Sequence, residues 1–251
     1  MTRLGQVGGS TPGRLGVWLS TMRTLTIDIG GTGIKLLPIG DDGQALAERQ
    51  RELTPKPSPP DAVMVMIRKM VADQKPFDRV SVGFPGVVRH GIVINAPNLG
   101  TPDWSGFNLQ DAIATLCGKP VRVLNDAELQ GYGVIDGTGV EIVLTLGTGL
   151  GTGLYVNGHL VPNVEFGHHP LLGAKTYEAL VGDAELGKVG KKKWRKRVAL
   201  VIETLERIFN YDTLHIGGGN AKKLQGPFPD NVRLFKNVDG LRGGVRLWQD
   251  D

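Results

Sequence analysis

The sequence predicts an α/β protein with two lobes, each built on a mixed sheet of the same design. Short apolar runs that indicate buried strands alternate with stretches of helical spacing. One such run, at residues 25–29, leads into Gly30-Gly31-Thr32-Gly33, and a second, at 141–146, leads into Gly147-Thr148-Gly149. Each glycine turn is followed by another strand and a hairpin. A repeat of this kind is more specific than either turn alone, and it predicts duplicated phosphate-binding units.

The first lobe is expected to cover residues 23–124. Strand 25–29 is followed by strands 35–39 and 46–53, which flank Gly40-Asp41-Asp42-Gly43, so three antiparallel strands are expected. Next we expect a helix capped by Ser58, whose core-facing residues are Val63, Met66, Ile67 and Met70. It is followed by a strand at 79–84 and a hairpin at 87–95. A helix over 108–117, capped by Asn108, and a strand at 121–124 complete this lobe.

The second lobe is expected to cover residues 125–251. After strand 141–146 a hairpin is expected across Asn157-Gly158. A strand at 213–216 then runs into a third glycine turn. Between them lies an amphipathic helix over 192–210, whose inward residues are expected to be Val198, Val201, Ile202, Leu205, Ile208 and Phe209.

Composition narrows the class of protein. The chain has 251 residues and a net charge of +4, and its single cysteine, Cys117, excludes a disulfide framework and a multi-cysteine zinc site. A reducing cytoplasm fits, and no apolar stretch is long enough to span a membrane. Residues 1–22 are rich in glycine, serine and threonine and are expected to be a disordered leader, too short for a helix-turn-helix domain. Neither nucleic acid nor membrane is an expected partner.

The first glycine turn has the chemistry of a phosphate site. Glycines after a strand bring backbone N–H groups close to an anion, and here they are Gly30, Gly31 and Gly33. Thr32 adds a hydroxyl and Lys35 a positive charge. Asp28 would repel phosphate unless a divalent cation lay between them, so we expect it to hold Mg²⁺ through water. The spacing matches neither a Walker loop nor a dinucleotide fingerprint. A plain glycine-rich hairpin is the alternative.

Six motifs in order carry a resemblance to a known family. They are Asp28-Ile-Gly-Gly-Thr-Gly33, Gly83-Phe-Pro-Gly86, Asn125-Asp126, Leu146-Gly-Thr-Gly-Leu-Gly151, Glu165-Phe-Gly-His168 and Ile216-Gly-Gly-Gly219. Over roughly residues 23–249 the chain resembles the ROK family of sugar kinases, and within it the branch of polyphosphate glucokinases and glucomannokinases.

The resemblance implies an actin-like (ribonuclease H-like) two-lobe fold. It also implies a magnesium-dependent, cytoplasmic kinase that transfers a phosphoryl group from polyphosphate, ATP or both to the 6-hydroxyl of glucose, with mannose as a second substrate. A homodimer is expected. A DNA-binding regulator of the family would need an N-terminal helix-turn-helix, and a non-catalytic actin-like sugar sensor or regulator is the other alternative.

Asp126 is the expected general base. Phosphorylation of a sugar hydroxyl needs a carboxylate within hydrogen-bond reach of that hydroxyl, and the resemblance implies this role for Asp126. The alternative is a helix N-cap, because aspartate before Ala-Glu-Leu is also good capping chemistry.

The sugar is expected to contact asparagine and acidic side chains. The resemblance implies contacts from Asn98, Asn125, Asp126, Glu165, His168 and Glu178. In zinc-bearing members His168 joins three cysteines downstream, but residues 167–182 contain none, so no structural zinc is expected. A structural role for Glu165 and His168 and an exposed helical position for Glu178 are the alternatives.

The donor is expected on the other glycine turns and along a basic run. Thr148 and Gly149 would face the transferred phosphoryl group, and Gly217, Gly218 and Gly219 would let a nucleotide approach the backbone. A basic run at 188–197 includes Lys191, Lys192 and Lys193, a candidate track for polyphosphate. A solvated helix face is the alternative.

Overall fold

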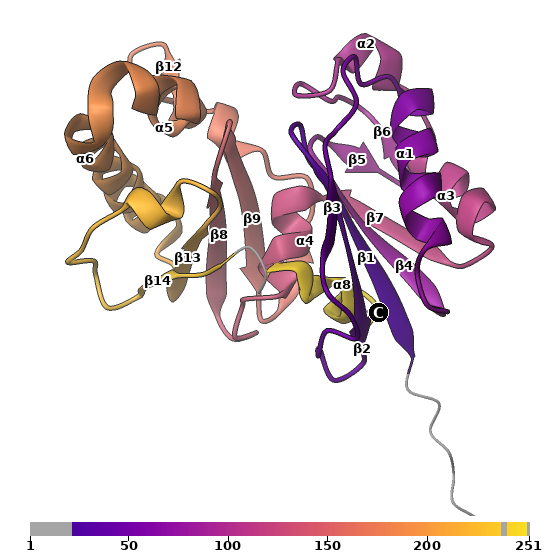
Figure 1. Ribbon diagram of the computed structural model, residues 1–251. Helices are drawn as coiled ribbons and strands as arrows, with labels where there is room; N and C mark the ends of the chain where they lie inside the picture. The colour runs from indigo at the N-terminus through magenta and orange to yellow at the C-terminus, as the bar shows by residue number, and fades with distance from the viewer. Residues whose placement is uncertain (1–21, 237–239, 250–251) are drawn as a thin grey trace, which may run out of the picture.

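The computed structural model describes residues 22–236 and 240–249, which form two lobes side by side (Figure 1). The expectation of a disordered leader therefore lies, for residues 1–21, outside the described residues. No helix within the described ranges is long and apolar enough to cross a membrane.

The two lobes contain sheets of identical topology. The first has the order β3-β2-β1-β4-β7 and the second β10-β9-β8-β13-β14. In each, the first three strands are antiparallel and the last two join in parallel. The strands are β1 (Arg23–Ile29), β2 (Ile34–Gly40), β3 (Gln50–Glu52), β4 (Arg79–Phe84) and β7 (Val121–Asn125), then β8 (Val140–Leu146), β9 (Leu150–Val156), β10 (His159–Val161), β13 (Thr213–Gly217) and β14 (Val232–Leu234). The predicted duplication is confirmed.

The remaining elements connect and cover the sheets. In the first lobe they are α1 (Pro60–Ala72), β5 (Val88–Arg89), β6 (Ile92–Val93), α2 (Thr101–Trp104) and α3 (Leu109–Cys117). Then follow α4 (Asp126–Tyr132), the 3₁₀ helix η1 (Phe166–His168), β11 (Pro170–Leu172), β12 (Lys175–Thr176), α5 (Tyr177–Val181), α6 (Asp183–Phe209), the 3₁₀ helix η2 (Ala221–Lys223) and α8 (Gly243–Arg246).

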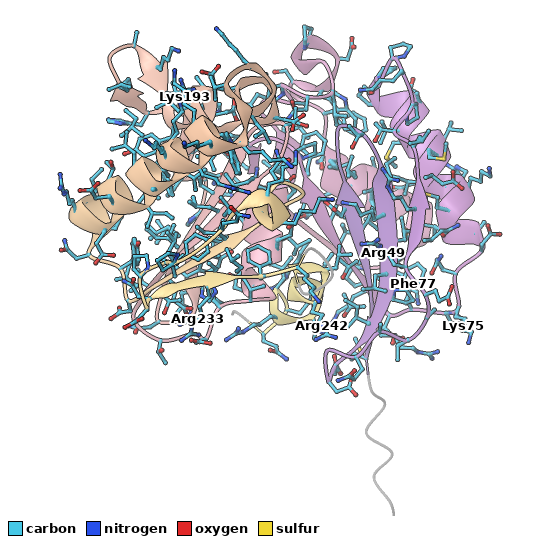
Figure 2. All side chains as sticks on the ribbon, turned by 60° about the vertical axis from the view of Figure 1, so that its left-hand side comes forward. Arg49, Lys75, Phe77, Lys193, Arg233 and Arg242 are labelled. Atoms are coloured by element: carbon cyan, nitrogen blue, oxygen red, sulfur yellow. The ribbon has the colours of Figure 1, made fainter. Side chains whose placement is uncertain are left out.

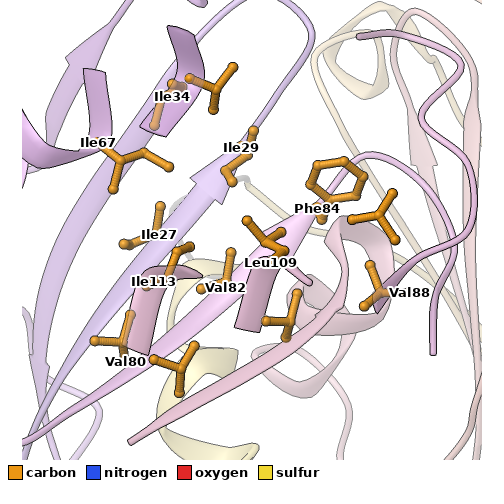
Figure 3. Close-up of a cluster of buried hydrophobic side chains, with 14 of the residues drawn as sticks. Ile27, Ile29, Ile34, Ile67, Val80, Val82, Phe84, Val88, Leu109 and Ile113 are labelled. Atoms are coloured by element: carbon orange, nitrogen blue, oxygen red, sulfur yellow. The ribbon is translucent and has the colours of Figure 1, made fainter. Parts of the chain in front are cut away.

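The first core lies between the first sheet and helices α1 and α3. Figure 3 shows Ile27, Val82 and Phe84 of the sheet facing Ile67 of α1 and Leu109 and Ile113 of α3, and all six side chains are buried. Full burial of each such side chain contributes about 1.5–3 kcal/mol. The ends of β1, β4 and β7, where the functional motifs begin, are thereby held in register.

Two local predictions are wrong. Ser58 does not cap α1: Pro59 occupies the N-cap, and the Ser58 hydroxyl instead donates to the carbonyl oxygen of Pro55 at 2.5 Å. Ile208 is 54% exposed, because the inward position at the end of α6 is taken by Phe209, whose ring packs 5.4 Å from that of Phe166.

Helix α6 also begins earlier than predicted, at Asp183, and kinks at Gly190. Its N-terminus is tied to the second glycine turn, since the Asp183 N–H donates to the carbonyl oxygen of Gly147 at 3.0 Å. The longer helix therefore starts beside a predicted donor-binding segment.

Helices α4 and α8 link the lobes, and Figure 1 shows both between the sheets. The Tyr155 hydroxyl of β9 donates to the carbonyl oxygen of Glu128 in α4. Ser81 of β4 donates to the carbonyl oxygen of Gly244 in α8 at 2.6 Å and accepts from the Trp248 indole at 2.8 Å. The last described segment thus packs on the first sheet, and the boundary at residues 124/125 stays a prediction.

Candidate active site

A cavity of about 250 Å³ is lined by residues of both lobes. It brings together most of the residues that the sequence singled out: Asp28, Gly30, Gly31, Thr32, Lys35, Asn98, Asn125, Asp126, Thr148, Gly149, Glu165, His168, Glu178, Gly218 and Gly219. Gly33, Gly217 and Lys191–Lys193 are not among its described lining residues. Three polar residues of the lining were missed by sequence reasoning, namely Asn95, Gln130 and Thr145.

Two of the three missed residues, Gln130 and Thr145, follow from spacing once the elements are known. Gln130 is one turn after Asp126 on α4, so both side chains lie on one helix face. Thr145 lies at the carboxyl end of β8, beside the second glycine turn. Both positions can be recognised in the sequence, but only once the bounds of α4 and β8 are known.

Gly33 and Gly217 belong to the first and third glycine turns but do not line the cavity. The carbonyl oxygen of Gly33 accepts the Gly30 N–H at 3.0 Å, which closes the first turn. A Cβ at Gly217 would lie 2.2 Å from the ring of Phe235, so any larger residue at this position would require that ring to move. Direct donor contacts from these two residues stay predictions.

Asp28 and Lys35 form an ion pair at the mouth of the first turn. They face each other across the register of β1 and β2, with Lys35 Nζ 2.6 Å from Asp28 Oδ2. Asp28 is buried and Lys35 is partly exposed toward the cavity. The pair places one negative and one positive group beside the glycine N–H groups, as the phosphate-site prediction requires.

Asp126 is the first residue of α4, and it is not the N-cap. Asn125 holds that position, with its side-chain oxygen accepting the Ala127 N–H at 2.8 Å and the Glu128 N–H at 3.4 Å. The N-cap alternative for Asp126 is therefore wrong. The carboxylate of Asp126 is left to line the cavity, with the Ala127 N–H donating to its Oδ1 at 2.8 Å.

The surroundings of Asp126 give it the proton affinity of a base. Burial raises the pKa of Asp126 to about 7, and the negative charges of Asp28 and Glu165 act in the same direction. The Ala127 N–H and the Lys35 ammonium oppose this shift. A carboxylate with a pKa near neutral pH can accept a proton during a reaction.

Asn125 already has partners for its amide. Besides the cap, its Nδ2 donates to the carbonyl oxygen of Gly86 at 3.2 Å. It lines the cavity but its contact with a sugar stays a prediction.

Glu165 and His168 line the cavity from the second lobe, directly before and within η1. His168 Nε2 is 3.8 Å from Glu165 Oε2, and the His168 side chain is 58% exposed. Burial raises the pKa of Glu165, while His168 opposes that shift. Both side chains therefore keep polar atoms available for hydroxyl groups.

Glu178 binds the second glycine turn. Its Oε2 accepts the Leu150 N–H at 3.0 Å, and a Cβ at Gly149 would lie 2.2 Å from the same oxygen. The alternative of an exposed helical glutamate is wrong, because the side chain lines the cavity. Glu178 therefore touches the predicted donor side as well as the space where the sugar is expected.

A β-hairpin orders the segment that follows His168. Strands β11 and β12 pair, Thr176 caps α5 by accepting the Ala179 N–H at 3.1 Å, and the Tyr177 N–H donates to the carbonyl oxygen of His169 at 3.2 Å. These hydrogen bonds fix Glu178 relative to His168 by backbone pairing.

We expect pure protein to contain no stoichiometric zinc and its unfolding temperature to be insensitive to a zinc chelator, since no cysteine lies near His168 and hairpin pairing already orders the segment. Elemental analysis and thermal unfolding with and without the chelator check this. About one zinc per chain would contradict it.

The chain is similar in sequence to proteins of one known family. Residues 24–187 match the family model described as ROK family. Polyphosphate glucokinase of Mycobacterium tuberculosis is 36% identical over 263 aligned positions, which cover 98% of this chain and 97% of that protein. That of Mycobacterium leprae is 34% identical over 243 positions, covering 90% and 74%.

Solved structures show the same arrangement. The inorganic polyphosphate/ATP-glucomannokinase of Arthrobacter sp. strain KM superimposes with a TM-score of 0.81 at 27% identity, covering 90% of this chain and 98% of that one. A ROK family glucokinase from Streptomyces griseus, solved with glucose and AMPPNP, has a TM-score of 0.74 at 21% identity, covering 90% and 98%. The second likeness shows the fold alone.

Proposed function

The chain belongs to the ROK family, with its actin-like fold of two lobes, and from that premise we propose that it phosphorylates the 6-hydroxyl of glucose, using polyphosphate, ATP or both. Mannose is the proposed second substrate. The observation that supports this most is the position of Asp126, a carboxylate of raised pKa in the cavity that the glycine turns and Glu165 also line.

In the proposed reaction Asp126 accepts the proton of the sugar hydroxyl. The hydroxyl oxygen attacks the terminal phosphorus of the donor, a new P–O bond forms, and the bond from that phosphorus to the rest of the donor breaks. The proton moves to the Asp126 oxygen that the Ala127 N–H does not occupy. The remaining donor leaves one phosphate shorter.

The donor is proposed to lie on the glycine turns. Gly30 and Gly31 line this part of the cavity from the first lobe, and Thr148 and Gly149 line it from the second. Gly218 and Gly219 line the same cavity and would let a nucleotide approach the backbone. Closure of the lobes would exclude water and so favour transfer to the sugar.

The residues present fit a hydrated magnesium ion. Asp28 offers a carboxylate in the cavity, and its charge is close enough to Asp126 to raise the pKa of that residue. Mg²⁺ favours such oxygen ligands and keeps several waters. We propose that Asp28 holds it through water, where it would neutralise charge on the donor phosphates. Lys35 balances Asp28 in its absence.

Polyphosphate is proposed to run along α6. Arg195 already donates to the carbonyl oxygen of Lys223 at 2.7 Å, and Arg197 pairs with Glu185. Lys191, Lys192 and Lys193 are exposed, and Figure 2 shows Lys193 on the surface of the second lobe. Because α6 begins beside the second glycine turn, these lysines could follow a polyanion that leaves the cavity.

A coupled assay of glucose and mannose, each with ATP and with polyphosphate, tests the function. Turnover of either sugar with either donor supports a kinase. Binding of glucose with no turnover in any combination would instead favour the non-catalytic sugar sensor. The proposed homodimer is checked by sedimentation of the pure protein, and the proposed cytoplasmic location by cell fractionation.

We expect Glu165→Ala and His168→Ala each to raise the KM for glucose by a factor that corresponds to about 1–3 kcal/mol, the cost of a lost hydrogen-bonding group. The KM for the donor should stay nearly unchanged, because neither residue touches a glycine turn through a described hydrogen bond. Glu178→Ala is the comparison variant: it removes the acceptor of the Leu150 N–H and should change both KM values. Equal damage to both KM values in Glu165→Ala would contradict the sugar contact.

A further inference from the structure

Glu128 is a buried carboxylate that the proposed mechanism does not use. It is 4% exposed and is the third residue of α4, two positions after Asp126. Its Oε2 accepts the Asn125 N–H at 3.3 Å, which completes a capping box with the Asn125 side chain. One carboxylate oxygen of Glu128 is thus hydrogen-bonded to the backbone of the residue that directly precedes the proposed base, Asp126.

The other oxygen reaches a distant part of the chain. Glu128 Oε1 accepts the N–H of Asn163 at 2.6 Å, across 35 positions of sequence. Asn163 has a positive φ of 61°, so it forms a tight turn two residues before Glu165. The next carbonyl oxygen, that of Val164, accepts the Thr152 hydroxyl at 2.7 Å. The turn that precedes Glu165 is therefore held by Glu128 on one side and by β9 on the other.

We propose that Glu128 is a positioning residue, whose carboxylate sets the placement of the sugar-binding Glu165 relative to the base Asp126. The inference rests on the proposed function. It assigns to Glu128 no contact with substrate: the carboxylate acts through two backbone N–H groups, one beside each functional residue.

The two hydrogen bonds that Glu128 accepts, from the Asn125 and Asn163 N–H groups, require a carboxylate. Each oxygen accepts from an N–H donor, and an ionised carboxylate has acceptors only. Glutamine keeps the size but turns one of the two positions into a donor, which then faces another donor. The lost bond frees either the N-terminus of α4 or the turn at Asn163. Burial raises the pKa of Glu128, and the two N–H groups oppose that shift because they stabilise the charged form.

The chain contains a matched control. Glu141 is 1% exposed, and it too accepts backbone N–H groups, here three of them, from Asp136 at 2.9 Å, Gly137 at 2.6 Å and Thr138 at 3.3 Å. It also contacts His215 at 2.8 Å, and it does not line the cavity. Glu141→Gln thus disturbs a buried carboxylate of the same kind away from the reacting groups.

The test compares Glu128→Gln with Glu141→Gln in steady-state kinetics and thermal unfolding. Both variants are expected to unfold at lower temperature. Only Glu128→Gln should lower kcat/KM for glucose, by about ten- to a hundredfold, the usual effect of a misplaced reacting group. The KM for the donor should not change. Glu128→Asp, which keeps the charge but shortens the reach, should act in the same direction and serves if the glutamine variant does not fold.

A double-mutant cycle separates positioning from loss of stability. If Glu128 acts through Glu165, adding Glu165→Ala to Glu128→Gln should reduce kcat/KM by much less than it does in the wild type. In the Glu141→Gln background, Glu165→Ala should lower kcat/KM by the same factor as it does in the wild type. Independent effects of Glu128→Gln and Glu165→Ala, or wild-type kinetics in a destabilised Glu128→Gln, would overturn the proposal. A wild-type chain without sugar kinase activity would refute the proposed function first, and the role of Glu128 with it.

Discussion

Asp126→Asn is expected to lower kcat by roughly 10²–10⁴, the usual contribution of a general base, while glucose still binds. Asparagine keeps the size of the side chain, and its oxygen can still accept the Ala127 N–H, so the local structure should persist. What disappears is the ability to take the proton of the sugar hydroxyl. Single-turnover kinetics with calorimetric measurement of glucose binding separate the two effects.

The raised pKa of Asp126 predicts how the activity and the stability of the wild type and of this variant should depend on pH. In the wild type, kcat/KM should fall as the pH drops through about 7, because the protonated carboxyl cannot accept a proton. Stability has the opposite trend. Since the folded pKa of about 7 exceeds the unfolded value of about 3.9, this residue favours folding less as the pH rises between them. Asp126→Asn should therefore gain in unfolding temperature, relative to wild type, as the pH rises from about 4 to about 7, and the difference should level off above that.

Asp61→Asn is the control, because Asp61 also lies in the first turn of a helix but is exposed on α1. It should leave both the rate and its pH dependence unchanged. Wild-type turnover in Asp126→Asn would remove Asp126 from the reaction.

The triple change Lys191→Glu, Lys192→Glu and Lys193→Glu is expected to weaken polyphosphate-driven turnover on the order of a hundredfold, with much less effect on the ATP reaction. Each lysine that contacts a phosphate releases counterions and adds to the salt dependence of binding. The wild-type polyphosphate reaction should consequently fall faster with added salt than the ATP reaction, and the triple variant should lose that difference. Initial rates over a salt series with both donors measure it.

A matched variant reverses three exposed charges on the first lobe, Arg68→Glu, Lys69→Glu and Lys75→Glu. It changes the net charge equally, so a shared effect would be due to overall charge. Neither triple change should unfold the protein, because exposed substitutions usually cost little stability. Equal rates with both donors in the Lys191–Lys193 variant would leave these lysines as a solvated helix face and the kinase assignment intact.

The repeated strand, glycine turn and hairpin could be predicted from local pattern alone. Apolar alternation and turn residues act over a few positions, so they determine strands such as 25–29 and 141–146 and their glycine turns wherever the chain later packs. The topology of both sheets agrees with that duplication. Asp28, Thr32 and Lys35 of the cavity lining were predicted in the same way, because they lie at or directly after a strand end, whereas Asn98 and Glu178 were predicted from the family resemblance.

Only the fold decided which of two neighbouring residues takes the N-cap position of a helix. The sequence left open whether Asp126 is a base or the N-cap of the helix that follows it, and asparagine is as good an N-cap as aspartate. Packing of β7 and α4 gave that position to Asn125 and left the carboxylate of Asp126 at the cavity. The same kind of local ambiguity explains why Ser58 was wrongly expected to cap α1.

Groups far apart in the sequence depend on tertiary structure entirely. The pKa of Asp126 results from burial and from Asp28, almost a hundred residues earlier, and the Glu128–Asn163 bond joins α4 to a turn of the second lobe. Hydrogen bonds and charges act over a few ångströms, so they exist only after both cores have packed. The sequence by itself determined which chemical groups the protein carries and on which elements, and the packed lobes decided which of them meet.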